Sequence, residues 1–319
     1  MRYLVTLRPL EPFMFGGDQT FGALGVKEAG SYLVKSRTFP QQTAILGMLK
    51  KELMTQAGVL TRKRKGEWVD KEKHTAAKAL VGSEKFNMLS ETLQDFGSIQ
   101  NISPVFLMKQ EQRYIKKVDS DSFPYVEGKL ENYDPKNDIY DNFVSLDGAH
   151  PVSSEAIFKA VEQTGNKKGG EENSLFKKTS LLLKDGFTFA FYIDMETELK
   201  SALVTLGADR SSFMMQVKET TQALDYHDKN GYLTLLSDAY ITLDIKEHAR
   251  FAITSELSHR NLTNKKHVTK KNAFEKSDTL YLYEKGSVFI DPSDALIRHI
   301  NNENLQQIGY NIYTIGEKK

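Results

Sequence analysis

The sequence predicts an α+β protein with antiparallel sheets, organised as two packed modules. The chain has 319 residues, which exceeds one domain of ordinary size, and its 39% hydrophobic residues can supply a core. It opens with a strand, a glycine-bearing loop and a helix, as a ferredoxin-like fold does, although a Rossmann unit begins in the same way. After about residue 220, several short strands follow with few helices between them. This pattern favours antiparallel sheets over a Rossmann fold.

The first strand is predicted from Arg2 to Leu10, where apolar residues alternate between two faces, and Pro9 and Pro12 end it. The next segment, FMFGGDQTFGALG, places Gly16 and Gly17 among phenylalanines. Glycine lets a backbone approach a ligand closely, and exposed aromatic rings can stack on that ligand. We therefore expect a flexible ligand-binding loop here.

The first helix is predicted to begin near Pro40, in the stretch SRTFPQQTAILGMLKKELM. Proline suits the first turn because it lacks the N–H group that a helix start leaves unpaired, and apolar residues then recur at helical spacing. Gln41, Gln42 and Thr43 follow it with uncharged hydrogen-bonding side chains. Free N–H groups and the helix dipole attract anions at such a position, which could hold a phosphate. The alternative is a well-capped core helix without a ligand.

The middle of the chain begins with a polar insertion and ends with an acidic segment. Residues 50–73 include the basic run Arg62 to Lys65 and are expected to form a solvated loop. A helix is predicted over 76–96, and strands over 99–108 and 114–118. From Asp119 to Asp147, eight acidic residues face two lysines, which gives a net charge of −6. We expect this segment to face solvent or a basic protein surface rather than RNA.

Two glycine-containing turns come next. Glu162 to Lys178 contains Lys167 and Lys168 among three glycines. It predicts either a hairpin with a lysine-bearing tip or an ordinary glycine-rich turn. Strands are predicted over 186–193, 202–206 and 213–217. The last two are joined by the turn LGADRSS, which contains Arg210 and Ser211.

The last third of the chain is predicted to be rich in strands and locally basic. Strands are expected over 232–236, 240–245 and 250–253, a hairpin over 280–290, a helix over 293–302 capped by Asp291 or Ser293, and a closing strand in IGYNIYTIGE. Between Arg250 and Lys276, seven Lys or Arg residues face two glutamates, a net charge of +5 before two histidines are counted. This predicts either a nucleic-acid contact or a charge-rich loop without a ligand.

The composition narrows the class of protein. With 43 Lys and Arg against 42 Asp and Glu, the formal net charge is +1, so local patches must hold any nucleic acid. Cysteine is absent, which excludes disulfides and thiolate metal sites. No dinucleotide fingerprint or P-loop is present, and we expect neither a cofactor nor a metal. The sequence has no apolar run of membrane-spanning length and begins directly with a strand pattern. We therefore expect a cytoplasmic protein with no signal peptide and no membrane partner.

The ordered series PLEPFMFGG, FPQQTAILGMLKKEL, LGADR, YEKGSVFI and IGYNIY resembles the repeat-associated (RAMP) superfamily of CRISPR proteins. Within that superfamily it most resembles the third subunit of type III-B (Cmr) effector complexes. Pro40, Thr43 and Gly47 match the family's proline–serine/threonine–glycine helix start, and Gly207 with Arg210 matches its glycine–acid–arginine turn. The family's late hairpin is matched by Gly286 to Phe289.

The resemblance implies a fold and a role. The fold would be two ferredoxin-like (RRM-like) domains, residues 1–218, with insertions at about 50–75 and 119–178, and residues 219–319. The role would be that of a non-catalytic subunit in antiviral defence. It would bind the 5′ handle of the guide RNA (crRNA) and join the large polymerase-like subunit to the RAMP backbone subunit. Glu162 to Lys178 is the candidate for the family's hairpin thumb.

A single-stranded handle is held by phosphate contacts to helix starts and cations, and by stacking of its bases on aromatic rings. The residues expected to contact RNA are Gly16, Gly17, Arg37, Gln41, Gln42, Thr43, Lys50, Lys167, Lys168, Arg210, Ser211, His259, Arg260, Lys265, Lys266, Lys270, Lys271, Tyr310 and Asn311. The chain departs from the family at Asp18 and Gln19, where a basic residue is frequent, and at Ala208, where glycine is usual.

Four alternatives stay open. The equivalent handle-binding subunit of type III-A complexes shares much of this pattern. A RAMP endoribonuclease that processes guide RNA would carry a histidine near the first loop and helix, but this chain has none before His74. Metal-dependent cleavage could use Asp18, which is otherwise a turn-forming residue beside Gly17. A protein scaffold without RNA contact would leave the basic segment 250–276 unexplained.

Overall fold

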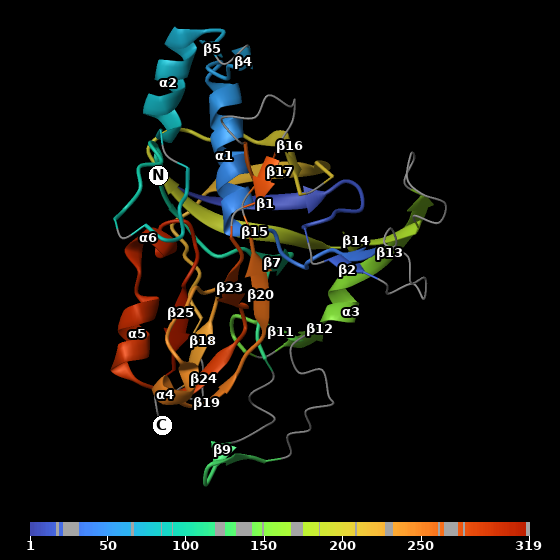
Figure 1. Cartoon of the computed structure of the whole chain (residues 1–319), viewed down its shortest axis with the longest axis vertical. Coiled ribbons are helices and arrows are strands. Elements are labelled where there is room, and N and C mark those ends of the chain that lie inside the picture. The colour runs from blue at the N-terminus through green and yellow to red at the C-terminus, as the bar shows by residue number, and fades with distance from the viewer. Residues whose placement is uncertain are drawn as a thin grey trace. The chain divides into compact units, whose positions relative to one another are not determined.

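The structure, a computed structural model, describes the chain except residues 17–18, 22–31, 65–66, 84, 91, 119–124, 132–141, 149, 167–174, 185, 208, 227–231, 261, 265–273, 277 and 317–319. It is mixed α/β and rich in sheet, with few helices, as the sequence predicts (Figure 1). The chain forms two compact units that are interleaved in sequence. Unit 1 comprises Met1–Ile115, Asn142–Tyr226 and Asn302–Tyr310, and unit 2 comprises Lys116–Asp141, His227–Asn301 and Asn311–Lys319. This division differs from a single boundary at residues 218/219, because the chain returns from unit 2 to unit 1 twice.

A nine-stranded sheet forms the centre of unit 1. Its order is β12-β11-β8-β7-β15-β1-β17-β16, and β6 also pairs with β15. The strands are β1 (Arg2–Pro9), β6 (Ile99–Ile102), β7 (Phe106–Lys109), β8 (Gln112–Lys116), β11 (Asn142–Ser145), β12 (Pro151–Ser153), β15 (Phe187–Met195), β16 (Ala202–Leu206) and β17 (Ser211–Glu219). β1 lies between β15 and β17, so Val5 is opposite both Phe191 and Val217. Tyr3, Val5 and Leu7 are buried, which confirms the predicted alternation along the first strand.

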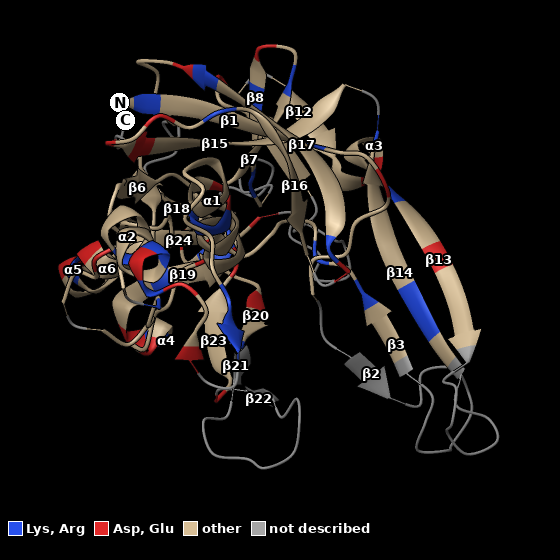
Figure 2. Ribbon diagram, turned by 90° about the horizontal axis from the view of Figure 1, so that it is seen from above, with Lys and Arg blue, Asp and Glu red and all other residues tan. Residues whose placement is uncertain are grey.

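A second sheet in unit 1 has the order β13-β14-β3-β2 (Figure 2). β13 (Phe158–Asn166) and β14 (Leu175–Leu183) pair antiparallel along their full length of nine residues, which confirms the hairpin predicted at 162–178. Its expected tip residues, Lys167 and Lys168, lie outside the described residues. β3 (Tyr32–Lys35) runs parallel to β14, and β2 (Gln19–Phe21) pairs with β3. The segment 13–25, expected to form a flexible loop, therefore contains one strand of this sheet, β2.

The helices of unit 1 correct two predictions. α1 (Gln42–Gln56) is the predicted first helix, and α3 (Ser154–Ile157) and α6 (Glu303–Gln306) are single turns. The expected solvated loop after α1 contains a short hairpin, β4 (Lys63–Arg64) and β5 (Glu67–Trp68), and the start of α2 (Lys71–Val81). The helix expected over 76–96 therefore begins earlier and ends at Gly82. Gly82 has a φ of +72°, and a Cβ there would lie 2.1 Å from the Asp95 carbonyl oxygen.

The strand expected over 99–108 is also two strands, β6 and β7. Pro104 lies between them. Proline has no N–H to donate to a neighbouring strand, which explains why the ladder is interrupted at this point.

Unit 2 contains one four-stranded sheet of order β19-β24-β18-β25 and three two-stranded sheets, β10-β9, β20-β23 and β21-β22. Its elements are β9 (Tyr125–Val126), β10 (Lys129–Leu130), β18 (Leu233–Leu235), α4 (Ile245–His248), β19 (Ala249–Ile253), β20 (Glu256–His259), β21 (Leu262–Asn264), β22 (Phe274–Lys276), β23 (Leu280–Tyr283), β24 (Val288–Pro292), α5 (Asp294–Ile300) and β25 (Tyr313–Ile315). Leu233, Leu235, Phe289, Leu296 and Ile300 form its core.

The predicted helix at the end of unit 2 is confirmed, with Ser293 as its cap. The Ser293 Oγ accepts a hydrogen bond from the Leu296 N–H at 3.3 Å. The hairpin expected over 280–290 is wrong, because β23 pairs with β20 whereas β24 pairs with β18 and β19. The strand expected over 240–245 is also wrong: Asp244 instead caps α4 by accepting from the Lys246 N–H at 3.0 Å. Of the closing stretch, only Tyr313–Ile315 is a strand.

Across the described parts of the chain, no helix is both long and apolar enough to cross a membrane.

Candidate nucleic-acid interface

Three of the sequence motifs meet in unit 1. The Arg37 N–H donates to the Phe15 carbonyl at 3.0 Å, and the Phe15 N–H donates to the Ser36 Oγ at 2.9 Å. Gly207 packs against Met14: its φ is +90°, and a Cβ there would lie 2.5 Å from the Met14 carbonyl oxygen. The first loop, the segment before α1 and the LGADR turn therefore form one cluster, which we call the loop cluster. Only glycine fits at 207 without moving that backbone.

Phenylalanines anchor the loop cluster from inside. Phe13 and Phe15 are 0% and 3% exposed. Together with Phe189 and Phe213 they form a group whose ring centroids are 4.7 to 6.5 Å apart. The expectation that aromatic rings of this loop stack on a ligand is wrong for Phe13 and Phe15, because their rings pack against other phenylalanines in the core. Gly16 is exposed, so the loop presents backbone there.

The two glutamines at the start of α1, Gln41 and Gln42, make different contacts. Gln41 is the N-cap residue, without a side-chain capping bond, and the first turn has no acidic residue. The Gln42 side chain is 3% exposed, and its Nε2 donates to the carbonyls of Ser103 at 3.0 Å and Ile308 at 2.8 Å. Gln42 is therefore a structural residue in this conformation, and its side chain is not exposed to a ligand here. Thr43 is half-buried, and its hydroxyl makes no hydrogen bond to a described residue.

The cations at the loop cluster are held in different ways. Arg210 is exposed on a left-handed backbone, with a φ of +56°. Lys178, on β14, forms an ion pair with Asp209 of the same turn. The sequence did not predict this link between hairpin and turn, because 31 residues separate the partners. Arg37 is half-buried, and Lys50, on α1, has its Nζ 4.5 Å from the centre of the Phe96 ring.

Four further residues expected to touch RNA are buried, so their side chains are not exposed to a ligand in this conformation. They are Ser211 (4% exposed), His259 (1%), Tyr310 (0%) and Asn311 (0%). The Ser211 Oγ donates to the Pro12 carbonyl at 3.2 Å, and the Tyr310 ring stacks on Phe86 with centroids 6.0 Å apart. In unit 2, the Asn311 side chain accepts from the Tyr240 N–H at 2.8 Å and donates to the Ile300 carbonyl at 3.1 Å.

Residues 261 and 265–273 of the basic segment, which include four of its seven Lys or Arg residues, lie outside the described residues. So do Gly17, Asp18, Lys167, Lys168, Lys265, Lys266, Lys270 and Lys271. Arg260 is described and exposed in unit 2, where its Nε donates to the Thr279 Oγ1. For these residues the RNA contacts stay predictions.

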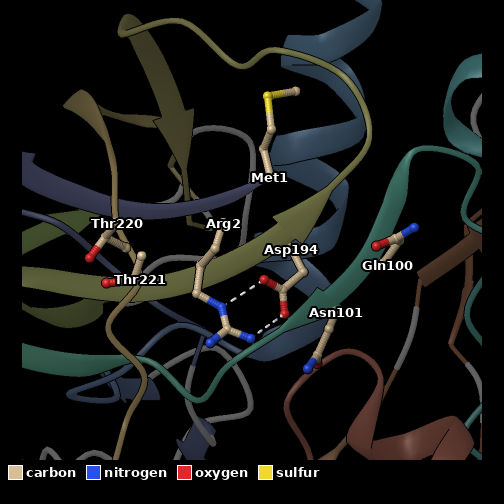
Figure 3. Close-up of a pocket in the computed structure, with 7 residues that line it drawn as sticks. All are labelled: Met1, Arg2, Gln100, Asn101, Asp194, Thr220 and Thr221. Atoms are coloured by element: carbon tan, nitrogen blue, oxygen red, sulfur yellow. Dashed lines mark hydrogen bonds and ion pairs between the residues drawn. The ribbon is translucent and has the colours of Figure 1, made fainter.

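A cavity of about 520 Å³ in unit 1 is lined by Arg2 and Asp194 (Figure 3). The guanidinium donates to both carboxylate oxygens, at 2.7 and 2.8 Å, and this hydrogen bonding raises the pKa of Arg2. Because the two charges neutralise each other, the cavity does not favour an anion such as a phosphate. In the described residues, no group of three or more His, Asp or Glu side chains is placed to hold a metal ion.

Comparison with known proteins connects this geometry to a family. Residues 5–116 match the family model described as "CRISPR-associated protein (Cas_Cmr3)". No curated protein matches the sequence. Among solved structures, a chain of "Cryo-EM structure of the Type III-B Cmr-beta bound to cognate target RNA" is similar, with 15% identity, coverage of 98% of this chain and 96% of that chain, and a TM-score of 0.55.

A second structure, "Cryo-EM structure of the Type III-B Cmr-beta bound to cognate target RNA and AMPPnP, state 1", contains a chain with 14% identity, coverage of 100% and 99%, and a TM-score of 0.53. At these identities the likeness concerns the fold. The family match covers the first loop, α1 and α2, so two of the three segments in the loop cluster lie inside it.

Proposed function

We propose that this chain, which is a Cmr3-like RAMP protein of the type III CRISPR class, is a non-catalytic subunit that binds the 5′ handle of a crRNA. In a type III-B complex it would join the large polymerase-like subunit to the RAMP backbone subunit. Its two parts would be elaborated ferredoxin-like domains. The equivalent role in a type III-A complex is the alternative, and the family match favours type III-B.

The observation that carries the proposal is the loop cluster itself. It combines exposed backbone at Gly16, the start of α1 without an acidic residue in its first turn, and the exposed guanidinium of Arg210. Phosphates of a single strand are bound by such N–H groups and cations, and a positive helix end adds to the attraction. Bases would have to stack on other groups, because Phe13 and Phe15 are in the core.

The β13–β14 hairpin supports a second element of the proposal. Its two strands start from the same sheet as β3 and extend by nine residues each, and the Lys178 ion pair ties β14 to the LGADR turn. A long hairpin anchored at the loop cluster suits a thumb that displaces a bound strand. We assign this role to residues 158–183.

Binding to labelled handle RNA tests the proposal. Arg210→Ala should weaken binding about five- to tenfold, since one lost charged contact at an exposed site is worth about 1 kcal/mol. Arg298→Ala, which removes an exposed arginine from α5 in unit 2, is the matched control and should leave affinity within about twofold. Equal losses of RNA affinity in both variants would show that the effect comes from total positive charge and not from the position of Arg210. If the unaltered protein bound handle RNA no better than an unrelated RNA of the same length, handle recognition would be ruled out.

A further inference from the structure

The insertion after α1 is strongly basic and is not used by the proposed function. From Arg62 to Lys78 the sequence contains seven Lys or Arg residues and three acidic residues, a net charge of +4. The β4–β5 hairpin and α2 lie beside the C-terminal end of α1 (Figure 1). α1 has 15 residues, so its two ends are about 20 Å apart and this insertion is a surface separate from the helix start.

The centre of the insertion is a stacked aromatic pair. The rings of Trp68, on β5, and His74, on α2, have centroids 3.9 Å apart and an interplanar angle of 19°. Lys63, opposite Trp68 in the hairpin, has its Nζ 4.9 Å from the centre of the indole ring. Both rings are only half-buried, so part of the pair faces solvent.

Cations gather around this pair. Lys71, His74 and Lys78 lie at positions i, i+3 and i+7 of α2, which places them on one face of the helix. The pKa of His74 is lowered by burial first, and then by the positive charges of Lys78 and Lys63. Two lysines from different elements therefore act on the same imidazole, and both disfavour its charged form.

These lysines have no acidic partner among the residues that the structure describes. Neither Lys63, Lys71 nor Lys78 forms an ion pair there, whereas Lys116, Lys177 and Lys178 each pair with a carboxylate. Cations without a described acidic partner repel one another, and an anionic ligand would relieve that repulsion. The ligand should carry both negative charge, which the lysines attract, and flat apolar rings, which can stack on the aromatic pair.

We propose that the β4–β5 hairpin and α2 form an accessory binding surface for single-stranded nucleic acid. Its phosphates lie against Lys63, Lys71 and Lys78, and a base extends the stack of Trp68 and His74. Stacking of this kind tolerates any base, so the surface binds without sequence preference. An acidic protein segment could satisfy the lysines but would leave the aromatic pair without a planar partner, which is why nucleic acid is the better match.

The chain contains one tryptophan, so its fluorescence reports on this surface alone. Titrating the full chain with an oligouridine that lacks the handle sequence should quench Trp68 in a saturable way. Raising the salt concentration should weaken binding, with a slope of roughly 0.7 per phosphate contact. A titration without quenching, or quenching that does not saturate, overturns the proposal.

Two double variants that remove equal charge distinguish binding at this surface from attraction by the overall charge of the protein. Lys71→Ala with Lys78→Ala should lower oligouridine affinity about tenfold and reduce the salt slope. Lys73→Ala with Lys246→Ala removes the same charge from exposed positions off this face and should change affinity less than twofold. Equal losses of affinity in the two double variants would overturn the proposal. Quenching of Trp68 by polyglutamate but not by RNA would also overturn it and would indicate an acidic protein as the ligand. Arg210→Ala should leave the quenching intact, so failure of this proposal and failure of handle binding are distinguishable.

Discussion

The side-chain amide of Gln42 occupies the space that a side chain at Gly309 would need. A Cβ at residue 309 would lie 2.0 Å from the Gln42 Nε2 and 2.7 Å from the Ile102 carbonyl oxygen, and Gly309 has a φ of +86°. The same Nε2 donates to the carbonyls of Ser103 and Ile308. The second and last of the sequence motifs are therefore joined in unit 1, where Gln42 connects the start of α1 to the turn after α6.

Gly309→Ala should destabilise the protein strongly. The new methyl group meets backbone as well as an amide, and the left-handed φ adds strain, so we expect a loss of about 2 kcal/mol or more in the free energy of unfolding. Chemical denaturation measures it. Gly47→Ala is the matched control: Gly47 is exposed within α1 and a Cβ there meets nothing within 4 Å. That variant should gain about 0.5–1 kcal/mol of stability. A loss of stability would mean that a side chain at residue 47 does meet neighbouring atoms.

Gln42→Leu should act on stability rather than on RNA. Leucine fills a similar volume but leaves the Ser103 and Ile308 carbonyls without their donor, at a cost of about 1–3 kcal/mol for each unsatisfied group. The melting temperature should fall while the folded fraction keeps its affinity for handle RNA. Lost affinity at unchanged melting temperature would return Gln42 to the RNA-binding residues.

Thr43→Val should do the opposite. The hydroxyl has no described hydrogen-bond partner, so valine should hardly change the melting temperature. If the hydroxyl donates to a guide phosphate, affinity should fall by about 0.5–1.5 kcal/mol, the range for one ordinary hydrogen bond. A drop in melting temperature alone would remove the start of α1 from the candidate site.

Lys285 should make stability depend on alkaline pH. Its side chain is buried, and this burial, opposed by Asp238 and Glu284, lowers its pKa from 10.5 to about 8. Between these pH values the unfolded chain binds more protons than the folded one, so this lysine makes stability rise as pH increases from about 8 to 10.5. Lys285→Met removes that dependence, and the difference between the two proteins should change by on the order of 2 kcal/mol across this window. Parallel pH profiles would show that Lys285 is not desolvated.

Asp18→Ala tests the non-catalytic role. Asp18 is the acid that a metal-dependent cleavage mechanism could use in the first loop. Target cleavage by an assembled complex should stay within a few-fold of normal when it is replaced. A fall by orders of magnitude in a complex of unchanged composition would make this chain an enzyme.

The sequence by itself determined several local elements and carried a resemblance to a family. Alternating apolar residues predicted β1, and helical spacing after Pro40 predicted α1. Ser293 was one of two predicted caps of α5, and a hairpin was one of two structures predicted for 162–178. Each of these depends on residues close in the chain, where propensity and periodicity act directly. The match of residues 5–116 to a CRISPR-associated family includes the first two of the five short motifs.

Only the tertiary structure decided which motif residues are available to a ligand. Gln42, Ser211, His259, Tyr310 and Asn311 are polar or aromatic residues in binding-like motifs, yet all are buried. Their partners are distant in sequence: Gln42 meets Ile308 across 266 residues, and Ser211 meets Pro12 across 199. In the same way, β23 and β24 are neighbours in the chain but pair with different strands. A buried polar group needs a hydrogen-bond partner, and where that partner comes from another part of the chain, local sequence cannot tell a structural contact from a ligand contact.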